Sequence, residues 1–202
     1  MGAVEGWTTT RLEAFSDGIF AIAATLLVLT FSVGSGRRLD LGRELLHLWP
    51  AYLAYVTSFV TIGIIWMNHH HTVSLIGRTD RTMLFLNNLL LLTVAFLPFP
   101  TKLVGDFLRS GEERAATLAY AATLLVMAIL HQAWWQYARR NRRLIADGVP
   151  DSALSAVDRA YLPGVPMYGS VLILALFSPL AAVFLTFAIA AFYLPSAALF
   201  DS

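Results

Sequence analysis

The side chains of this 202-residue sequence that could carry chemistry lie at the ends of long apolar segments. Asp17 interrupts the first apolar segment, and three consecutive histidines follow the second. Successive positions on a helix are about 100° apart, so His69, His70 and His71 cannot all face one ion, and helical zinc sites use i, i+4 spacing instead. We therefore predict no metal site. A structural or interfacial role remains for the cluster, with pH sensing as the alternative.

Enzymatic chemistry has little support in the sequence. It contains no glycine-rich phosphate loop, no His-Glu-x-x-His element and no Gly-x-Ser-x-Gly element. The absence of cysteine excludes disulfides and thiolate metal sites. A net charge of +1 without a basic stripe gives no case for nucleic-acid binding. We predict that the protein is not an enzyme, has no cofactor and binds no nucleic acid.

Composition places the chain in a membrane. It is 57% hydrophobic and 13% charged, whereas soluble domains average about 25% charged residues. A hydrocarbon core of about 30 Å requires roughly 20 apolar residues per helix, and several runs of that kind occur. We predict an all-α integral membrane protein in which residues 1–202 form a single transmembrane domain.

Glycine, proline and charged residues divide the apolar sequence into spans. The last run, residues 167–200, has 34 residues and would form a helix of about 51 Å, too long for one straight span. We divide it at Ser178 and Pro179, with a single kinked helix as the alternative. Asp147, Asp151 and Asp158 lie in a polar connector before it. The six predicted spans are residues 11–31, 50–67, 83–100, 115–136, 165–178 and 180–198.

Positive charge predicts the orientation. With the N-terminus inside, the cytosolic segments hold eight Lys and Arg residues and the opposite side holds six. The excess is small, but Arg139, Arg140, Arg142 and Arg143 directly follow the fourth span, where the positive-inside rule is strongest. We predict that both termini are cytosolic.

The first span presents two different faces at about 100° per residue. One arc is mostly aliphatic and includes Phe15, Gly18, Ile22, Thr25, Leu26 and Leu29. Two interpretations are open. The stripe is either the core of the helical bundle or the lining of a pore built by several copies. In the second case rings of Ile22, Leu26 and Leu29 form a hydrophobic constriction, which gates by dewetting, and Thr25 adds a ring of hydroxyls.

Asp17 points nearly opposite Ile22, so it cannot form a ring in such a pore. Ionisable groups at or inside a membrane boundary mark a functional site by default. We interpret Asp17 and its neighbours as a polar clamp that joins the first span to the second and third. Its predicted members are Arg11, Ser16, Asp17, Trp66, Asn68, His69 and His70. Asn87 and Asn88 are candidate hydrogen-bond partners, with ordinary interhelical adhesion as the alternative.

The first span also carries a family signature, Arg11-x-x-x-Phe15-Ser16-Asp17-Gly18-Ile19-Phe20-Ala21-Ile22-Ala23-x-Thr25-Leu26-Leu27-Val28-Leu29. It resembles the pattern of the prokaryotic relatives of the lysosomal potassium channel, the transmembrane protein 175 type. Further segments are similar to family patterns in the same order: Trp66-Met67-Asn68-His69-His70, Asn88-Leu89-Leu90-Leu91-Leu92 and Phe96-Leu97-Pro98-Phe99-Pro100-Thr101. The remainder of the chain matches by span count only.

The resemblance implies a single six-helix repeat that assembles as a homotetramer, with the first helices lining a central cation path. The family's aliphatic constriction then falls on Ile22, Leu26 and Leu29, and its threonine layer, linked to potassium preference, falls on Thr25. We expect a potassium-permeable, weakly to modestly selective cation channel of the bacterial plasma membrane. Its partners are other copies of the chain, membrane lipids and monovalent cations.

Two other functions remain open from the residues alone. One is a proton-coupled secondary transporter that uses Asp17 and the histidines at 69, 70 and 71 as proton sites. Against it, the sequence shows no inverted repeat and no mid-span discontinuous helix. The other is a membrane scaffold without transport.

Overall fold

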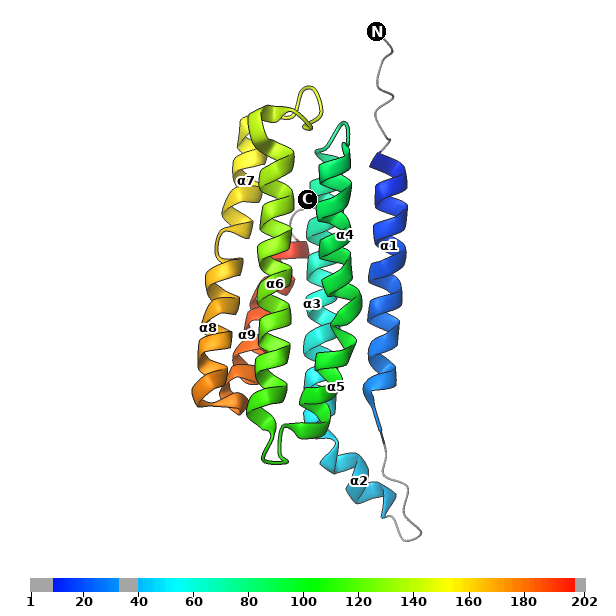
Figure 1. The fold of residues 1–202 in the computed structure, drawn as a ribbon, viewed down its shortest axis with the longest axis vertical. Coiled ribbons are helices and arrows are strands. Elements are labelled where there is room, and N and C mark those ends of the chain that lie inside the picture. Colours follow the sequence, from blue (N-terminus) through cyan, green and yellow to red (C-terminus); the bar gives the residue numbers. More distant parts are fainter. Residues whose placement is uncertain (1–8, 33–39, 199–202) are drawn as a thin grey trace.

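The computed structural model describes residues 9–32 and 40–198, most of which are helical (Figure 1). The elements are α1 (Thr9–Leu26), the 3₁₀ helix η1 (Leu27–Thr30), α2 (Leu41–His47), α3 (Trp49–Ser74), α4 (Arg81–Phe96), α5 (Pro98–Phe107), α6 (Glu113–Arg139), the 3₁₀ helix η2 (Arg140–Arg142), α7 (Asp151–Tyr161), α8 (Gly164–Phe177) and α9 (Pro179–Ala198). Within the described ranges, five helical segments are long and apolar enough to cross a membrane, and the apolar part of α9, Pro179–Leu194, is shorter. The predicted all-helical membrane fold is confirmed at this level, and the sixth span stays a prediction.

The long helices stand side by side, with α1 at one edge of the bundle and α8 and α9 toward the other (Figure 1). α1 packs on α3 and α4, whereas α6 contacts α4, α5, α8 and α9. The main core lies between these helices and includes Phe20, Leu27, Leu90, Leu124 and Met127. Because α1 has neighbours on one side only, its other side is left on the outside of the subunit.

Prolines shape two of the helix boundaries. Pro98 has no N–H to continue the hydrogen bonds of α4, but it suits the first turn of α5. α5 then runs to Phe107, so the predicted span 83–100 ends too early. Ser178 and Pro179 separate α8 from α9, and these two helices pack against each other instead of forming one kinked helix.

The segment interpreted as a polar connector contains a helix, α7. Leu154 and Val157 are spaced i, i+3 and are buried on one side of it. Asp158 forms an ion pair with Arg139 of α6 and accepts a hydrogen bond from Trp135 Nε1 at 2.8 Å. The sequence analysis did not identify this helix, because the charged residues hid a short amphipathic pattern.

Two loops meet at the end of the bundle where α3 and α6 finish. The Gly77 N–H donates to the Leu144 carbonyl at 3.0 Å, and Ile76 and Ile145 form an isolated β-bridge. A Cβ at Gly77 would lie 2.9 Å from the Ala146 Cα atom, so this close approach requires glycine. The contact ties the loop before α4 to the loop after α6.

Asp80 joins three elements at the same end. Its carboxylate accepts hydrogen bonds from the Met83 N–H (2.9 Å), the Tyr137 hydroxyl (2.8 Å) and the Arg143 guanidinium (2.6 Å). Desolvation raises the pKa of Asp80, but these hydrogen bonds and the charge of Arg143 lower it, and the net pKa lies below the ordinary value of 3.8. The carboxylate therefore caps α4 and holds the end of α6 in place.

We expect Asp80→Asn to lower the free energy of unfolding at neutral pH by about 1 kcal/mol, because the charged acceptor of three hydrogen bonds is lost. The pKa is lower in the folded state than in the unfolded state, so the stabilisation is present above the ordinary carboxyl pKa. It is lost as pH falls through the folded-state value. Melting temperatures in detergent, followed by tryptophan fluorescence, should differ at pH 7 and converge below about pH 4.

The matched control is Asp147→Asn, which removes an exposed carboxylate from the loop after α6. This variant should melt like the wild type at every pH. A difference between Asp80→Asn and wild type that persists unchanged in acid contradicts the stabilising role of the charge.

Candidate functional site

One face of α1 and η1 is buried and the opposite face is open. The buried residues, each at most 5% exposed, are Leu12, Ser16, Phe20, Ala23, Leu27 and Thr30. On the open face Ile22 is 60% exposed, Leu26 40% and Leu29 71%, and Phe15 and Thr25 are also exposed. The interpretation of this stripe as the core of the helical bundle is therefore wrong, because the stripe lies on the outer surface of the chain.

The 3₁₀ turn aligns the end of the open stripe. Ile22 and Leu26 lie one α-helical turn apart, and side chains at i and i+3 eclipse one another in a 3₁₀ segment, which brings Leu29 into line with Leu26. η1 packs on α3 and α5. The ring of Phe31, next in the chain, lies 5.4 Å from the Tyr52 ring and 5.1 Å from the Tyr55 ring. These contacts hold the stripe as a row along the helix.

Thr25 places an oxygen within this apolar row. Its hydroxyl donates to the Ile22 carbonyl at 2.9 Å. Because the hydroxyl proton is used inside the helix, the lone pairs of the oxygen remain to accept a hydrogen bond or to coordinate a cation. The open face therefore combines three aliphatic side chains with one neutral oxygen ligand.

The buried face is joined to the bundle by a polar network. The Asn87 side-chain amide donates to Ser16 Oγ at 3.1 Å, and the Ser16 hydroxyl donates to the Leu12 carbonyl at 2.8 Å. His69 Nε2 lies 2.8 Å from Asn87 Oδ1 and donates to it. The His69 ring stacks on Trp134, with centroids 4.8 Å apart and planes 16° apart. The network links α1, α4, α3 and α6.

Two further contacts join α1 to α3 nearer the surface. Trp66 Nε1 donates to Asp17 Oδ1 at 2.8 Å. His70 Nδ1 lies 2.9 Å from Glu13 Oε1. We use the name α1 polar contacts for the contacts of Glu13, Ser16 and Asp17 together with the Asn87–His69 hydrogen bond that continues from Ser16.

The structure brings most of the predicted clamp residues into these contacts: Ser16, Asp17, Trp66, His69 and His70. Arg11 is exposed and makes no hydrogen bond or ion pair within the part of the chain that the structure describes. Asn68 is also outside the clamp, because it lies about 100° around α3 from His69 and lines a different cavity. Its backbone carbonyl accepts a hydrogen bond from the Tyr161 hydroxyl at 2.9 Å.

Two residues, Asn88 and Glu13, depart from the predicted set of partners, whereas Asn87 is a partner as expected. Of the two candidate asparagines, Asn87 is buried in the network and Asn88 is exposed. Glu13 was not predicted as a member. Its position one turn before Asp17 was the available signal, because residues spaced i, i+4 share a helix face.

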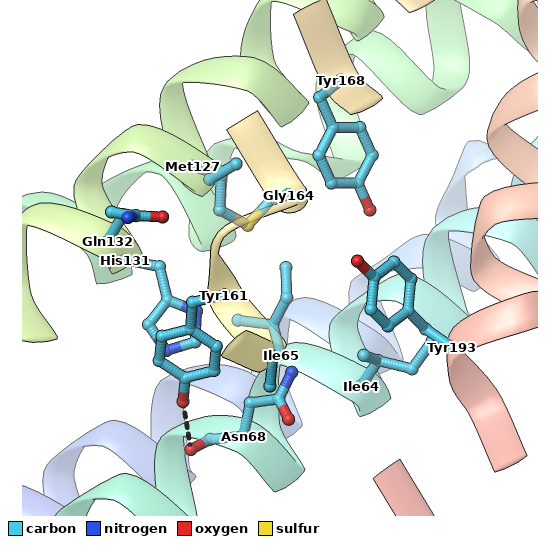
Figure 2. Close-up of a pocket in the computed structure, with 12 residues that line it drawn as sticks. Ile64, Ile65, Asn68, Met127, His131, Gln132, Tyr161, Gly164, Tyr168 and Tyr193 are labelled. Carbon is cyan, nitrogen blue, oxygen red and sulfur yellow. Dashed lines mark hydrogen bonds between the residues drawn. The ribbon is translucent and has the colours of Figure 1, made fainter. Parts of the chain in front are cut away.

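A separate cavity of about 70 Å³ lies among α3, α6, α8, α9 and the end of α7 (Figure 2). Its polar lining residues are Asn68, His131, Gln132, Tyr161, Tyr168 and Tyr193. His131 is 8% exposed, and its ring lies 4.6 Å from that of Tyr161. Neither a residue of α1 nor a carboxylate is among its lining residues, so the cavity is separate from the open α1 face.

The three consecutive histidines diverge. His69 reaches Asn87 on α4, whereas His70 reaches Glu13 on α1. Across residues 9–32 and 40–198, no group of three or more His, Cys, Asp or Glu side chains could hold a metal ion.

The part of the chain that contains α1, α3 and α4 also matches a known protein family. The family model described as the endosomal/lysosomal potassium channel TMEM175 matches residues 11–98. A potassium channel of Chamaesiphon minutus is 41% identical over 169 residues, 82% of this chain and 83% of the relative. A potassium channel of Streptomyces collinus is 43% identical over 153 residues, 72% of each.

The fold agrees with a solved channel. The crystal structure of a lysosomal potassium-selective channel TMEM175 homolog from Chamaesiphon minutus superposes with a TM-score of 0.85 and 37% identity, covering 94% of this chain and 97% of that one. The names of these relatives agree with the prediction that the chain is not an enzyme. On the extent and identity of these matches, the chain belongs to the TMEM175 family.

Proposed function

We propose that this protein is a potassium-permeable, modestly selective cation channel. Four copies place their α1 helices around a shared axis, and the path narrows at Ile22, Leu26 and Leu29. The observation that carries the proposal is the open α1 face, an aligned aliphatic row on the outside of a membrane subunit with one hydroxyl in it. Two relatives that are named potassium channels also support it, because this chain aligns with most of the length of each.

Assembly follows from the position of the open face. A row on the outer surface of one subunit encloses a path only when other copies complete the wall. Beside it, a largely apolar groove between α1 and α3 is lined by Asp17, Phe20, Ala21, Ala24, Phe59, Ile62, Gly63 and Trp66. Phe59 and Trp66 on its rim are exposed, which suits burial against a neighbouring copy. Native mass spectrometry of the purified protein should give four chains, and a monomer that conducts contradicts the proposal.

The proposed location is the bacterial plasma membrane with both termini in the cytosol. The start of α1 and the arginine-rich turn after α6 lie at the same end of the bundle (Figure 1). The positive-inside rule assigns such an end to the cytosol.

Thr25 tests the selectivity part of the proposal. Thr25→Val keeps the shape of the side chain but removes the oxygen that a partly dehydrated cation would contact. We expect the preference for potassium over sodium to fall about fivefold, equivalent to about 1 kcal/mol between the two ions, while potassium flux persists. Flux from liposomes that hold purified protein, in potassium or in sodium, measures both. Thr25→Ser retains the hydroxyl and should keep the wild-type preference.

A proton-coupled transporter is the rival function. The same flux assay separates the two, because a channel conducts without a coupled ion gradient. Potassium flux that requires a proton gradient, and that Asp17→Asn abolishes at intact assembly, supports the transporter. Asp17, His69 and His70 each have a fixed protein partner in the α1 polar contacts, which favours a structural role for them.

A further inference from the structure

The outer face of α6 carries an exposed stripe that changes from apolar to basic. Its members, at spacings of three and four residues, are Val126, Ile129, Ala133, Gln136 and Arg140. This spacing places them on one side of the helix. The 14 residue steps from Val126 to Arg140 correspond to about 21 Å at 1.5 Å per residue. The stripe therefore runs from the interior of the membrane to the end of the α6 span at Arg142.

The basic end of the stripe is hollowed. The hollow is lined by Gln136, Tyr137, Arg139, Arg140 and Asn141. None of these residues is acidic. Asn141 and the next residue, Arg142, both have a backbone φ of 55°, and the chain turns away from the α6 axis at this point. Arg140 is consequently left exposed at the end of the stripe.

Arg140 differs from its neighbours in its charge balance. Arg139 is paired with Asp158, Arg142 with Asp151 and Arg143 with Asp80. Arg140 has no ion pair with any residue in the described ranges. The carbonyl end of a helix carries about half a negative charge, which the full charge of one guanidinium exceeds. The hollow therefore keeps an unneutralised cation next to the exposed side chain of Gln136, whose amide has two N–H donors and uses one of them on Asp158 Oδ1 at 3.4 Å.

We propose that this surface binds an anionic phospholipid. The Arg140 guanidinium receives the headgroup phosphate, for which its planar pair of N–H donors is suited. The Gln136 amide lies beside it, and an acyl chain lies along Ala133, Ile129 and Val126. The continuous apolar track favours a lipid over a soluble anion, because a free phosphate has no apolar group that could pack against it. The proposal depends on α6 crossing a membrane, and it holds whether or not the protein conducts potassium.

The test uses the full-length protein in a neutral detergent. Native mass spectrometry with added phosphatidylglycerol or phosphatidylcholine measures lipid retention, and inorganic phosphate and glycerol phosphate serve as soluble probes. We expect wild type to retain phosphatidylglycerol preferentially, and Arg140→Gln to reduce that preference about fivefold, the size of one arginine near an anionic headgroup. The matched control is Arg109→Gln, an exposed arginine in the connection between α5 and α6 at the other end of the bundle.

Four outcomes overturn the proposal, and the first three concern lipid binding. Arg140→Gln retains phosphatidylglycerol like wild type, Arg109→Gln loses it equally, or glycerol phosphate alone binds as well as the lipid. Dissociation of the oligomer by Arg140→Gln would also overturn it, because the stripe would then be an interface between copies. Unchanged melting of Arg140→Gln shows that the fold is intact. A second variant, Ile129→Asp, should reduce lipid retention without touching Arg140.

Discussion

Ile22→Asn is expected to raise potassium flux through the reconstituted protein by at least about tenfold, equivalent to lowering the barrier by about 1.4 kcal/mol. Ile22 is 60% exposed on the subunit surface and begins the aligned row with Leu26 and Leu29. In the proposed tetramer, four copies of Ile22 would form an aliphatic ring that water leaves readily. An amide at the same position hydrogen-bonds water and keeps the constriction wet, so the permeating ion loses less of its hydration.

The measurement is potassium efflux from liposomes at equal protein density, with sodium efflux recorded in parallel. Selectivity should relax as flux rises, because a wetter constriction demands less dehydration of either ion. The matched control is Ile173→Asn, since Ile173 is 61% exposed but lies on α8, away from α1. Ile173→Asn should leave flux unchanged. If Ile22→Asn also leaves conduction unchanged while Asp17→Asn at intact assembly removes it, the transporter is the correct function.

The two faces of α1 show what periodicity can predict and where it stops. A rotation of 100° per residue correctly placed Ile22, Leu26 and Leu29 on one arc and Asp17 on another. Periodicity reports that a face is apolar, but an apolar face is equally suited to the core of a subunit and to the wall between subunits. The family signature favoured the second interpretation, and the exposure of the row supports it.

Some helix boundaries and side-chain partners could not be predicted, because the same local sequence is compatible with more than one structure. The charges of α7 concealed Leu154 and Val157. The predicted span 83–100 ends beside two prolines, although Pro98 also suits the first turn of a new helix, α5. Within the predicted clamp, neighbours in sequence separate in space. His69 faces α4 while Asn68 faces the cavity of Figure 2, since adjacent helical positions diverge by 100°. Side-chain partners of this kind depend on how the helices pack.

The second large effect is expected from Asn87→Leu, which should lower the free energy of unfolding by about 2 kcal/mol, the cost of leaving buried polar groups unpaired. Asn87 is 2% exposed and bonds both Ser16 and His69. Leucine fills a similar volume, so the loss reports on hydrogen bonds rather than on a cavity. His69 already has a buried Nδ1 without a protein partner among the described residues, so the substitution leaves that ring with neither nitrogen paired.

The adjacent residue supplies the control for this substitution. Asn88→Leu makes the same chemical change on the exposed face of α4 and should melt at or slightly above the wild-type temperature. Thermal unfolding by tryptophan fluorescence measures stability, and native mass spectrometry measures the tetramer. Because Ser16 lies on the buried face of α1, opposite the open row, loosening it should also weaken assembly and reduce potassium flux. Equal melting temperatures of Asn87→Leu and Asn88→Leu contradict the clamp, since they mean that the buried network does not stabilise the packing of α1 on the bundle.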